Sequence, residues 1–247
     1  MSRRIAIIIG AGPGLGSSIA RALLPTHSLV LLSRSLPGSL PKLGLGQVSD
    51  DTVLACSSDG SRDTLDAAVE QMKKKWPEGT VDVGVFNTGG AAWSPGGFLD
   101  QKIDDLKANV DNNIYAAFNF SQTILPLILD SEPNPTTKGR GTLLFTGATM
   151  SLRGGAKFSA MAPPMFARRA LAQSLAREFG PKGVHVAHIV VDGQIETERV
   201  QKMSQVTDTE DKRLHPDDLA QTYLALINQP RSTWTQELDI RPYCETF

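Results

Sequence analysis

The glycine-rich segment that follows the first apolar run constrains the fold of this chain more than any other feature. The run Ile5–Ile9 is β-branched and of strand length, residues 10–16 read GAGPGLG, and Ser17–Leu24 has helical periodicity. A strand, a glycine turn and a helix in this order let backbone amides approach a pyrophosphate closely, and the helix N-terminus then faces the anion. The segment therefore predicts a dinucleotide-binding loop. Its expected contacts are Gly10, Pro13, Gly14, Leu15 and Gly16.

Apolar runs of strand length alternate with helical patterns along the rest of the chain. The expected strands are Ile5–Ile9, Ser28–Leu32, Thr52–Ala55, Val81–Phe86, Thr142–Phe145 and Val184–Val191. The expected helices are Ser17–Leu24, Thr64–Lys75, Leu106–Leu129 and Phe166–Phe179. This alternation predicts an α/β fold, a doubly wound (Rossmann) parallel sheet of about seven strands with helices on both faces. We expect residues 1–247 to form a single dinucleotide-binding domain.

Composition and charge argue against a nucleic-acid-binding, a membrane-bound or a metal-binding protein. The 247 residues include 25 Lys and Arg and 26 Asp and Glu, a net charge of -1, which indicates neither nucleic-acid nor membrane-surface binding. Short cationic runs, Lys73–Lys75 and Arg168–Arg169, are typical of solvated helix faces. Cys56 and Cys244 lack metal-ligand spacing, so no metal site is expected. No apolar stretch has the length of a membrane span or a signal-peptide core, and the expected compartment is the cytoplasm.

The residues after the second expected strand bear on the choice of dinucleotide. An acidic side chain at this point accepts hydrogen bonds from the ribose hydroxyls of NAD, whereas an arginine suits the 2′-phosphate of NADP. This chain has Ser33, Arg34 and Ser35 there and no acid nearby. The segment therefore favours NADP(H) as cofactor, with these three residues near the 2′-phosphate. The alternative is an exposed arginine in a loop.

Several segments resemble one family over nearly the whole chain. Gly10, Gly14 and Gly16 match its glycine pattern. Residues 87–90, Asn-Thr-Gly-Gly, are similar to the Asn-Asn-Ala-Gly after its fourth strand, and residues 175–184 are similar to its sixth helix and the start of the next strand. On these motifs the chain resembles the short-chain dehydrogenase/reductases, which implies an oxidoreductase that binds a nicotinamide dinucleotide.

The resemblance also implies roles for individual residues. Asn113 falls at the helix asparagine that supports a water and proton relay, and Asp59 stands where the family has an aspartate near the adenine. Residues 192–197 resemble the family's Pro-Gly-x-Ile-x-Thr, with Asp192 in place of proline. The further cofactor contacts implied in this way are Ser58, Asp59, Gly60, Asn87, Thr88, Gly89, Gly193, Ile195 and Thr197.

The catalytic positions depart from the family pattern. The family uses a tyrosine and a lysine four residues apart on one helix, and the lysine lowers the pKa of the phenol so that it exchanges a proton with the substrate. Counted back from Leu175, these positions hold Met161 and Met165. The family serine falls on Ala148, and Thr149 is the nearest hydroxyl. Neither methionine carries a proton, so ordinary carbonyl reduction loses its acid.

An acceptor that already carries positive charge does not need this acid. Hydride delivery to an iminium gives a neutral amine, so the loss of tyrosine and lysine is compatible with reduction of an imine, an iminium or another activated double bond. Residues 162–165, Ala-Pro-Pro-Met, also resemble an Asp-Pro-Pro-Trp segment of fungal relatives from indole-alkaloid pathways, which combine iminium reduction with a Diels–Alder cyclisation. Alternatively, Pro163 and Pro164 only mark the start of a helix.

The favoured function is thus NADPH-dependent reduction of a bulky apolar small molecule, in secondary metabolism. The candidate catalytic residues are Asn113, Thr149 and Asp192, although Asp192 is also compatible with capping a turn at the strand end. Two alternatives are a cyclase or isomerase that keeps NADP(H) as a structural cofactor, and a non-catalytic NADP(H)-binding protein. Family resemblance implies a homodimer or homotetramer that pairs through the helices containing Asn113 and Ala170.

Overall fold

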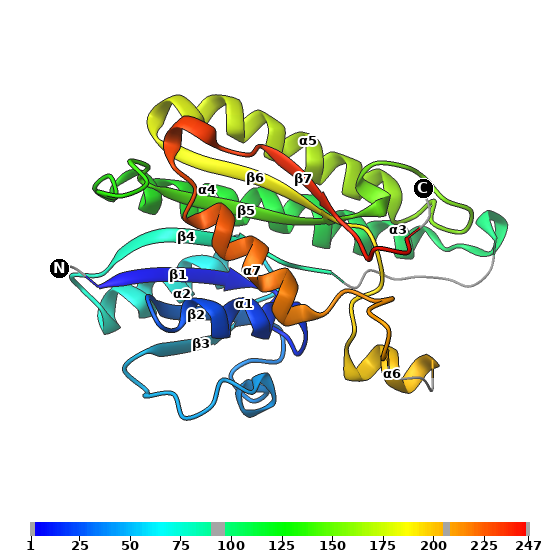
Figure 1. The fold of residues 1–247 in the computed structure, drawn as a ribbon, viewed down its shortest axis with the longest axis horizontal. Helices are drawn as coiled ribbons and strands as arrows, with labels where there is room; N and C mark the ends of the chain where they lie inside the picture. Colours follow the sequence, from blue (N-terminus) through cyan, green and yellow to red (C-terminus); the bar gives the residue numbers. More distant parts are fainter. Residues whose placement is uncertain (1–2, 90–96, 205–207, 246–247) are drawn as a thin grey trace.

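The computed structural model describes residues 3–89, 97–204 and 208–245 and contains one twisted parallel sheet (Figure 1). The sheet has seven strands in the order β3-β2-β1-β4-β5-β6-β7. These are β1 (Arg4–Ile9), β2 (Ser28–Ser33), β3 (Val53–Ser57), β4 (Thr80–Phe86), β5 (Gly141–Ala148), β6 (Val184–Val191) and β7 (Glu237–Ile240). The doubly wound sheet expected from the sequence is therefore confirmed.

Helices cover both faces of the sheet. They are α1 (Leu15–Leu23), α2 (Arg62–Lys75), α3 (Ile103–Val110), α4 (Ala116–Leu129), α5 (Ala162–Phe179), α6 (Glu198–Ser204) and α7 (Pro216–Ile227). The alternation within β1 shows how the sequence assigns the faces, because side chains of a strand point to opposite sides in turn. Ala6 and Ile8 belong to the core under α1 and α7, and Ile5, Ile7 and Ile9 belong to the core under α2, α4 and α5.

Two parts of the fold differ from the expected elements. The expected helix Leu106–Leu129 is divided, because a π-helical segment, Asp111–Tyr115, separates α3 from α4. A π turn holds one more residue than an α turn, and such segments often occur at functional sites. The strand β7 and the helices α6 and α7 were not among the elements expected.

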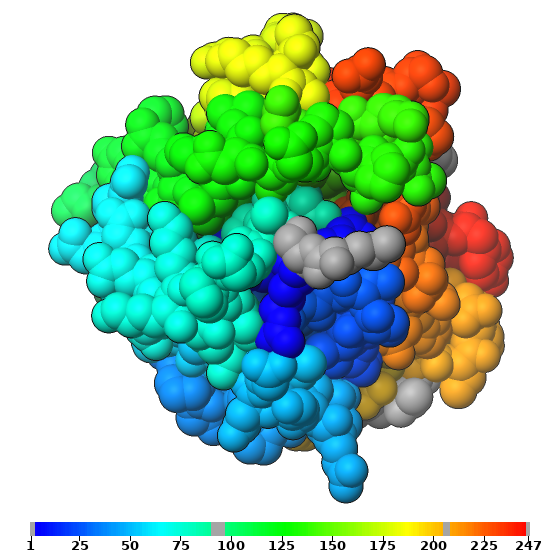
Figure 2. Space-filling model, turned by 90° about the vertical axis from the view of Figure 1, so that its left-hand side faces the viewer, coloured from blue at the N-terminus to red at the C-terminus, as the bar shows by residue number. Residues whose placement is uncertain are grey.

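The carboxyl ends of all seven strands lie along one edge of the sheet, where α6 and the segment after β6 also lie (Figure 1). From the opposite end, where the strands begin, the start of β1 emerges in the middle of the molecule (Figure 2). In the part of the chain that the structure describes, no helix combines the length and hydrophobicity needed to cross a bilayer.

Candidate functional site

The glycine segment lies at the point where the strand order reverses. Both β2 and β4 pair with β1, so the connections that follow β1 and β4 leave the sheet in opposite directions and open a crevice between them. Gly10 has a φ of +84°, and a Cβ there would lie 2.3 Å from the carbonyl oxygen of Asn87. A Cβ on Gly16 would lie 2.3 Å from the carbonyl oxygen of Gly10. Only glycine fits either position, and the turn brings the start of α1 to the crevice.

Asn87 fixes this turn to the neighbouring strands. Its Nδ2 donates to the carbonyl oxygen of Gly10 at 3.2 Å, and its Oδ1 accepts from Thr146 Oγ1 at 2.9 Å. Because Thr146 uses its proton on Asn87, it accepts a hydrogen bond from Tyr223, whose Oη lies 2.7 Å away. Burial raises the pKa of Tyr223 well above its ordinary value, so the phenol stays protonated and donates.

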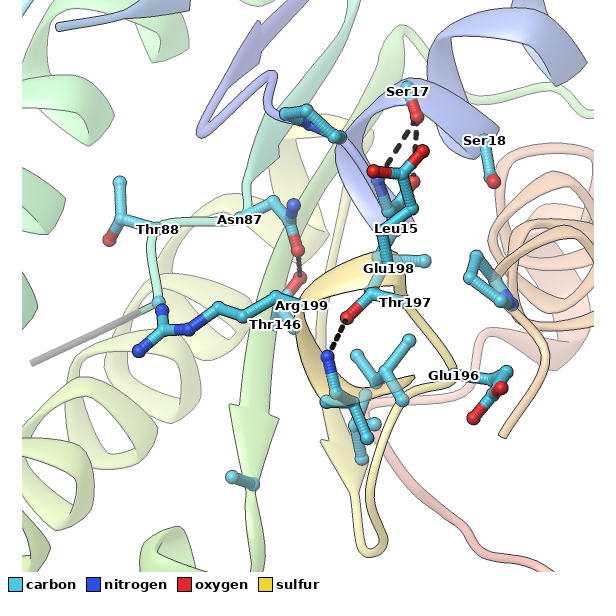
Figure 3. A pocket seen from close by; sticks show the side chains of 18 of the residues that line it. Leu15, Ser17, Ser18, Asn87, Thr88, Thr146, Glu196, Thr197, Glu198 and Arg199 are labelled. Atoms are coloured by element: carbon cyan, nitrogen blue, oxygen red, sulfur yellow. Dashed lines mark hydrogen bonds between the residues drawn. The ribbon is translucent and has the colours of Figure 1, made fainter. Parts of the chain in front are cut away.

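A groove of about 890 Å³ extends from the glycine turn across the carboxyl ends of β4, β5 and β6. Thr197 lies beside Gly14, and Arg199 extends from the same segment toward the Thr88 side of the groove (Figure 3). The predicted residues that line the groove are Pro13, Gly14, Leu15, Asn87, Thr88, Gly89, Asn113, Met161, Met165, Gly193, Ile195 and Thr197. The structure thus brings together most of the predicted contacts; Gly90, also part of the family motif, lies outside the described residues.

A second cavity, of about 560 Å³, lies at the carboxyl ends of β2 and β3. Arg34, Asp59 and Gly60 line it, together with residues of the π segment and α4. Hydrogen bonds from Ser61 lower the pKa of Asp59, so this side chain is an ionised acceptor.

The three predicted serines lie close by but do not line this cavity. Ser33 and Ser35 lie next to Arg34, with their hydroxyl oxygens 3.4 Å apart. Ser58 is buried, and its Oγ accepts from the backbone N–H of Gly60 at 3.1 Å.

The catalytic positions of the family contribute apolar atoms to the groove. Ala148, Met161 and Met165 all line it. Thr149 Oγ1 donates a short hydrogen bond to Asp192, whose carboxylate also lies 3.3 Å from a guanidinium nitrogen of Arg241. Thr149 and Asp192 are not among the groove-lining residues in the described part of the chain. Of the three candidate catalytic residues, Asn113 alone faces the groove.

Arg168 is the functional candidate that the sequence did not predict. The solvated helix face expected for Arg168–Arg169 is wrong at Arg168, which is 1% exposed, because this position turns inward from α5 toward the carboxyl ends of β4 and β5. One terminal nitrogen of its guanidinium donates to the carbonyl oxygen of Thr146 at 2.6 Å. The other donates to the carbonyl oxygen of Thr88 at 3.0 Å and to Oδ1 of Asn113. Arg169, by contrast, forms a two-point pair with Glu237.

The surroundings of Arg168 hold its positively charged guanidinium at the groove. Its guanidinium carbon lies 4.8 Å from the centre of the Phe86 ring, within the range of a cation–π contact. Burial lowers the pKa of Arg168 to about 9, so the side chain remains charged at neutral pH. Arg168 also lines the groove, one helical turn beyond Met165. This spacing is the signal that would have found it.

The fold and the crevice are those of a dinucleotide-binding α/β protein. Comparisons with known proteins identify the family within this class. The family model for short chain dehydrogenases matches residues 4–208. An uncharacterised oxidoreductase of Staphylococcus aureus (strain USA300) is 24% identical over 243 residues, 98% of each chain. A short-chain dehydrogenase from Rhodopseudomonas palustris is 28% identical, with a TM-score of 0.75 over 97% of this chain and 99% of its own.

A second solved structure is a short chain oxidoreductase from Pseudomonas aeruginosa PAO1, described as containing an atypical catalytic center. It is 16% identical, with a TM-score of 0.80 over 99% of this chain and 98% of its own. At this identity the likeness concerns the fold. The chain belongs to the short-chain dehydrogenase family of oxidoreductases.

Proposed function

We propose that this protein is an NADPH-dependent reductase that acts on an activated double bond of a bulky, apolar small molecule. The observation that carries the proposal is the composition of the groove. Ala148, Met161 and Met165 line it where the family places its serine, tyrosine and lysine. Among the described residues, these three positions therefore offer no phenol or ammonium to a simple ketone, and such a proton donor is worth about 10²–10⁴-fold in rate. The proposed role of the site is to bind and orient reactants.

The choice of NADPH rests on the second cavity. Arg34 supplies a guanidinium there, and the ionised Asp59 lines the same space near the adenine. A guanidinium pairs with a phosphate through charge-assisted hydrogen bonds. The glycine turn at the groove suits the pyrophosphate, because Gly10 and Gly16 let the backbone turn tightly against Asn87 and bring the start of α1 to the groove. When bound, NADPH supplies the hydride.

The chain's own residues hold the acceptor and exclude water. The two methionine side chains are flexible and polarizable, so they suit a bulky apolar surface. Two acceptor types fit a site without a phenol: an imine or iminium, and a double bond conjugated to a carbonyl. In the second type the hydride adds to the β-carbon and gives an enolate, which is less basic than the alkoxide formed from a ketone, so its oxygen needs charge stabilisation rather than immediate protonation. Asn113 is the proposed polar group that lines the groove. Thr149 and Asp192 do not line it but follow the lining residues Ala148 and Val191, and their mutual hydrogen bond supports a proposed shared role.

The test is a comparison of acceptors with purified protein and NADPH. We expect cyclic iminium ions or conjugated enones with aromatic substituents to consume NADPH stoichiometrically and aromatic ketones not to. The variant A148S/M161Y/M165K should gain ketone reduction by about 10²-fold, because it restores the proton donor. Cyclisation without NADPH consumption, or dinucleotide binding without turnover of any acceptor, would contradict the proposal.

We also propose a cytoplasmic homodimer or homotetramer that pairs through α4 and α5. Phe118 of α4 and Phe166 of α5 are large apolar residues on the surface of these helices, and Tyr115 of the adjoining π segment is 60% exposed. Exposed aromatic side chains of this kind support a buried contact between copies.

A further inference from the structure

Arg168, the cation at the reactive end of the groove, pairs with no carboxylate of the described residues. In the part of the chain that the structure describes, Arg168 is bonded to the carbonyl oxygens of Thr88 and Thr146, the hydroxyl of Thr88 and the amide oxygen of Asn113. Its Nε, also buried, has no hydrogen-bond partner among the described residues. These groups are dipoles and leave the positive charge itself uncompensated. An unpaired charge inside a protein acts over a longer distance than one in water, because the surroundings screen it less.

Asp192, the acidic member of the three candidate catalytic residues, does not offset the charge of Arg168. Asp192 lies at the end of β6, but its carboxylate accepts from Thr149 and pairs with Arg241 at 3.3 Å. Arg199 adds a second cation on the rim of the groove, where it is exposed to water and therefore screened. Three carboxylates also line the groove, and each pairs with a cation: Glu196 with Arg213, Glu198 with Lys202 and Asp217 with Arg21. Among the described residues, the positive charge of Arg168 is therefore not offset by these groups.

The layout of the two cavities indicates which part of the dinucleotide meets this charge. The glycine turn would hold the pyrophosphate, and the cavity of Arg34 and Asp59 would hold the adenosine half. The nicotinamide half would then enter the groove lined by Met161, Met165 and Arg168. The oxidised nicotinamide ring carries a positive charge and the reduced ring carries none.

We infer that Arg168 is a specificity-determining residue that favours NADPH over NADP⁺ and an acceptor that gains negative charge over one that is already a cation. The inference rests on the proposed function and narrows its substrate class. A buried guanidinium repels the oxidised ring and an iminium alike, and it leaves the reduced ring and a neutral acceptor unaffected. The class that fits is an α,β-unsaturated carbonyl compound with a bulky apolar body.

The reduction of such a compound balances without a protein acid. The hydride forms a C–H bond at the β-carbon, and the π electrons of the C=C bond move to make an enolate, whose oxygen carries the negative charge that Arg168 stabilises. Water then protonates the α-carbon. NADPH is oxidised to NADP⁺, and the C=C bond is reduced to a single bond.

Dissociation constants for NADPH and NADP⁺ test the inference without any substrate. We expect the wild-type protein to bind NADPH at least about 10-fold more tightly than NADP⁺. Arg168→Met should reduce this ratio about 10-fold, whereas Arg168→Lys, which keeps the charge, should hold it within about 3-fold. Arg169→Met is the matched control, because Arg169 is the next residue of α5 but does not line the groove; its ratio should equal that of the wild type.

The outcomes separate the inference from the proposed function. Equal affinities of the wild type for the two dinucleotides, or an unchanged ratio in a folded Arg168→Met protein, would overturn the inference and leave the proposed function standing. If Arg168→Met does not fold, the ratio of the wild-type affinities for NADPH and NADP⁺ tests the inference by itself. Binding of neither dinucleotide would overturn both. Faster turnover of a cyclic iminium than of a matched enone would overturn the acceptor class alone.

Discussion

At the scale of single residues, the pocket around Arg34 bears on cofactor choice. Arg34→Glu places a carboxylate where the 2′-phosphate is expected, so the affinity for NADPH should fall by about 10–100-fold while that for NADH changes little. Fluorescence titration with both dinucleotides measures this. Arg62→Glu is a suitable control, because Arg62 pairs with Asp66 on the exposed side of α2. Equal weakening of NADPH and NADH would contradict the assignment of Arg34.

The glycine turn has no room for a side chain at Gly10. Gly10→Ala should lower the free energy of unfolding of the cofactor-free protein by more than about 1 kcal/mol, because the new Cβ meets the Asn87 carbonyl oxygen and the backbone keeps a positive φ. Gly12→Ala is the matched control, since a Cβ at Gly12 meets nothing within 4 Å. Urea denaturation compares the two. A similar small change in both variants would show that the turn relaxes around the added methyl group.

At the scale of elements, β6 carries a buried histidine that makes stability depend on pH. Burial lowers the pKa of His188 to about 4, even though Glu237 of β7 lies 3.1 Å from its Nδ1 and opposes the shift. The unfolded chain takes up a proton near pH 6.5 and the folded chain only near pH 4, so stability falls as the pH drops through this window. The full effect is about 3 kcal/mol.

Urea denaturation at several values of pH between 6.5 and 5 measures this slope. His188→Gln keeps a polar side chain beside Glu237 and removes the titration, so its stability should vary less over the same range. His185 contributes in the same direction, because burial also lowers its pKa, and some slope should therefore remain. An identical slope in the wild type and the variant would rule out His188 as the source.

The helices and strands differ in how well the sequence predicts them. The strand Val184–Val191, buried on both faces, was predicted with its observed bounds because a run of this length rich in β-branched residues has few other solutions. The other predicted strands overlap the observed ones but differ at one or both ends. Pro163 marks the start of α5, as the helix-start interpretation expects, because proline is tolerated in a first helical turn. By contrast, β7 is only four residues long and half-exposed, so its pattern is too short to indicate a strand.

For the site, local patterns predicted the residues that the turn and strand ends bring together, from Gly10 to Thr197. The arginine pair by itself indicates a solvated helix face, and only the spacing of Arg168 from Met165, one helical turn, indicates that it shares the groove-facing side of the helix. The partners of Asp192 are a different case. Its contacts with Thr149 and Arg241 join residues that are distant in sequence, and no spacing rule reports them.

At the scale of the whole molecule, the exposed aromatic residues of α4 and α5 predict self-association. Size-exclusion chromatography with light scattering should give the mass of a dimer or tetramer. Phe118→Lys should shift the protein toward the monomer, because it places a charge in the contact. Phe98→Lys is the control, since Phe98 is also exposed but lies before α3. A monomeric wild type would contradict the proposed assembly.

We propose that this groove delivers a hydride from NADPH to carbon without the tyrosine and lysine of the family. The most direct measurement uses NADPH carrying deuterium at the transferred position, with a bulky conjugated enone and purified protein, and mass spectrometry of the product. We expect one deuterium per product molecule, bound at the former β-carbon, and one NADP⁺ formed for each. A product without deuterium, or an unchanged enone beside fully bound NADPH, would contradict it.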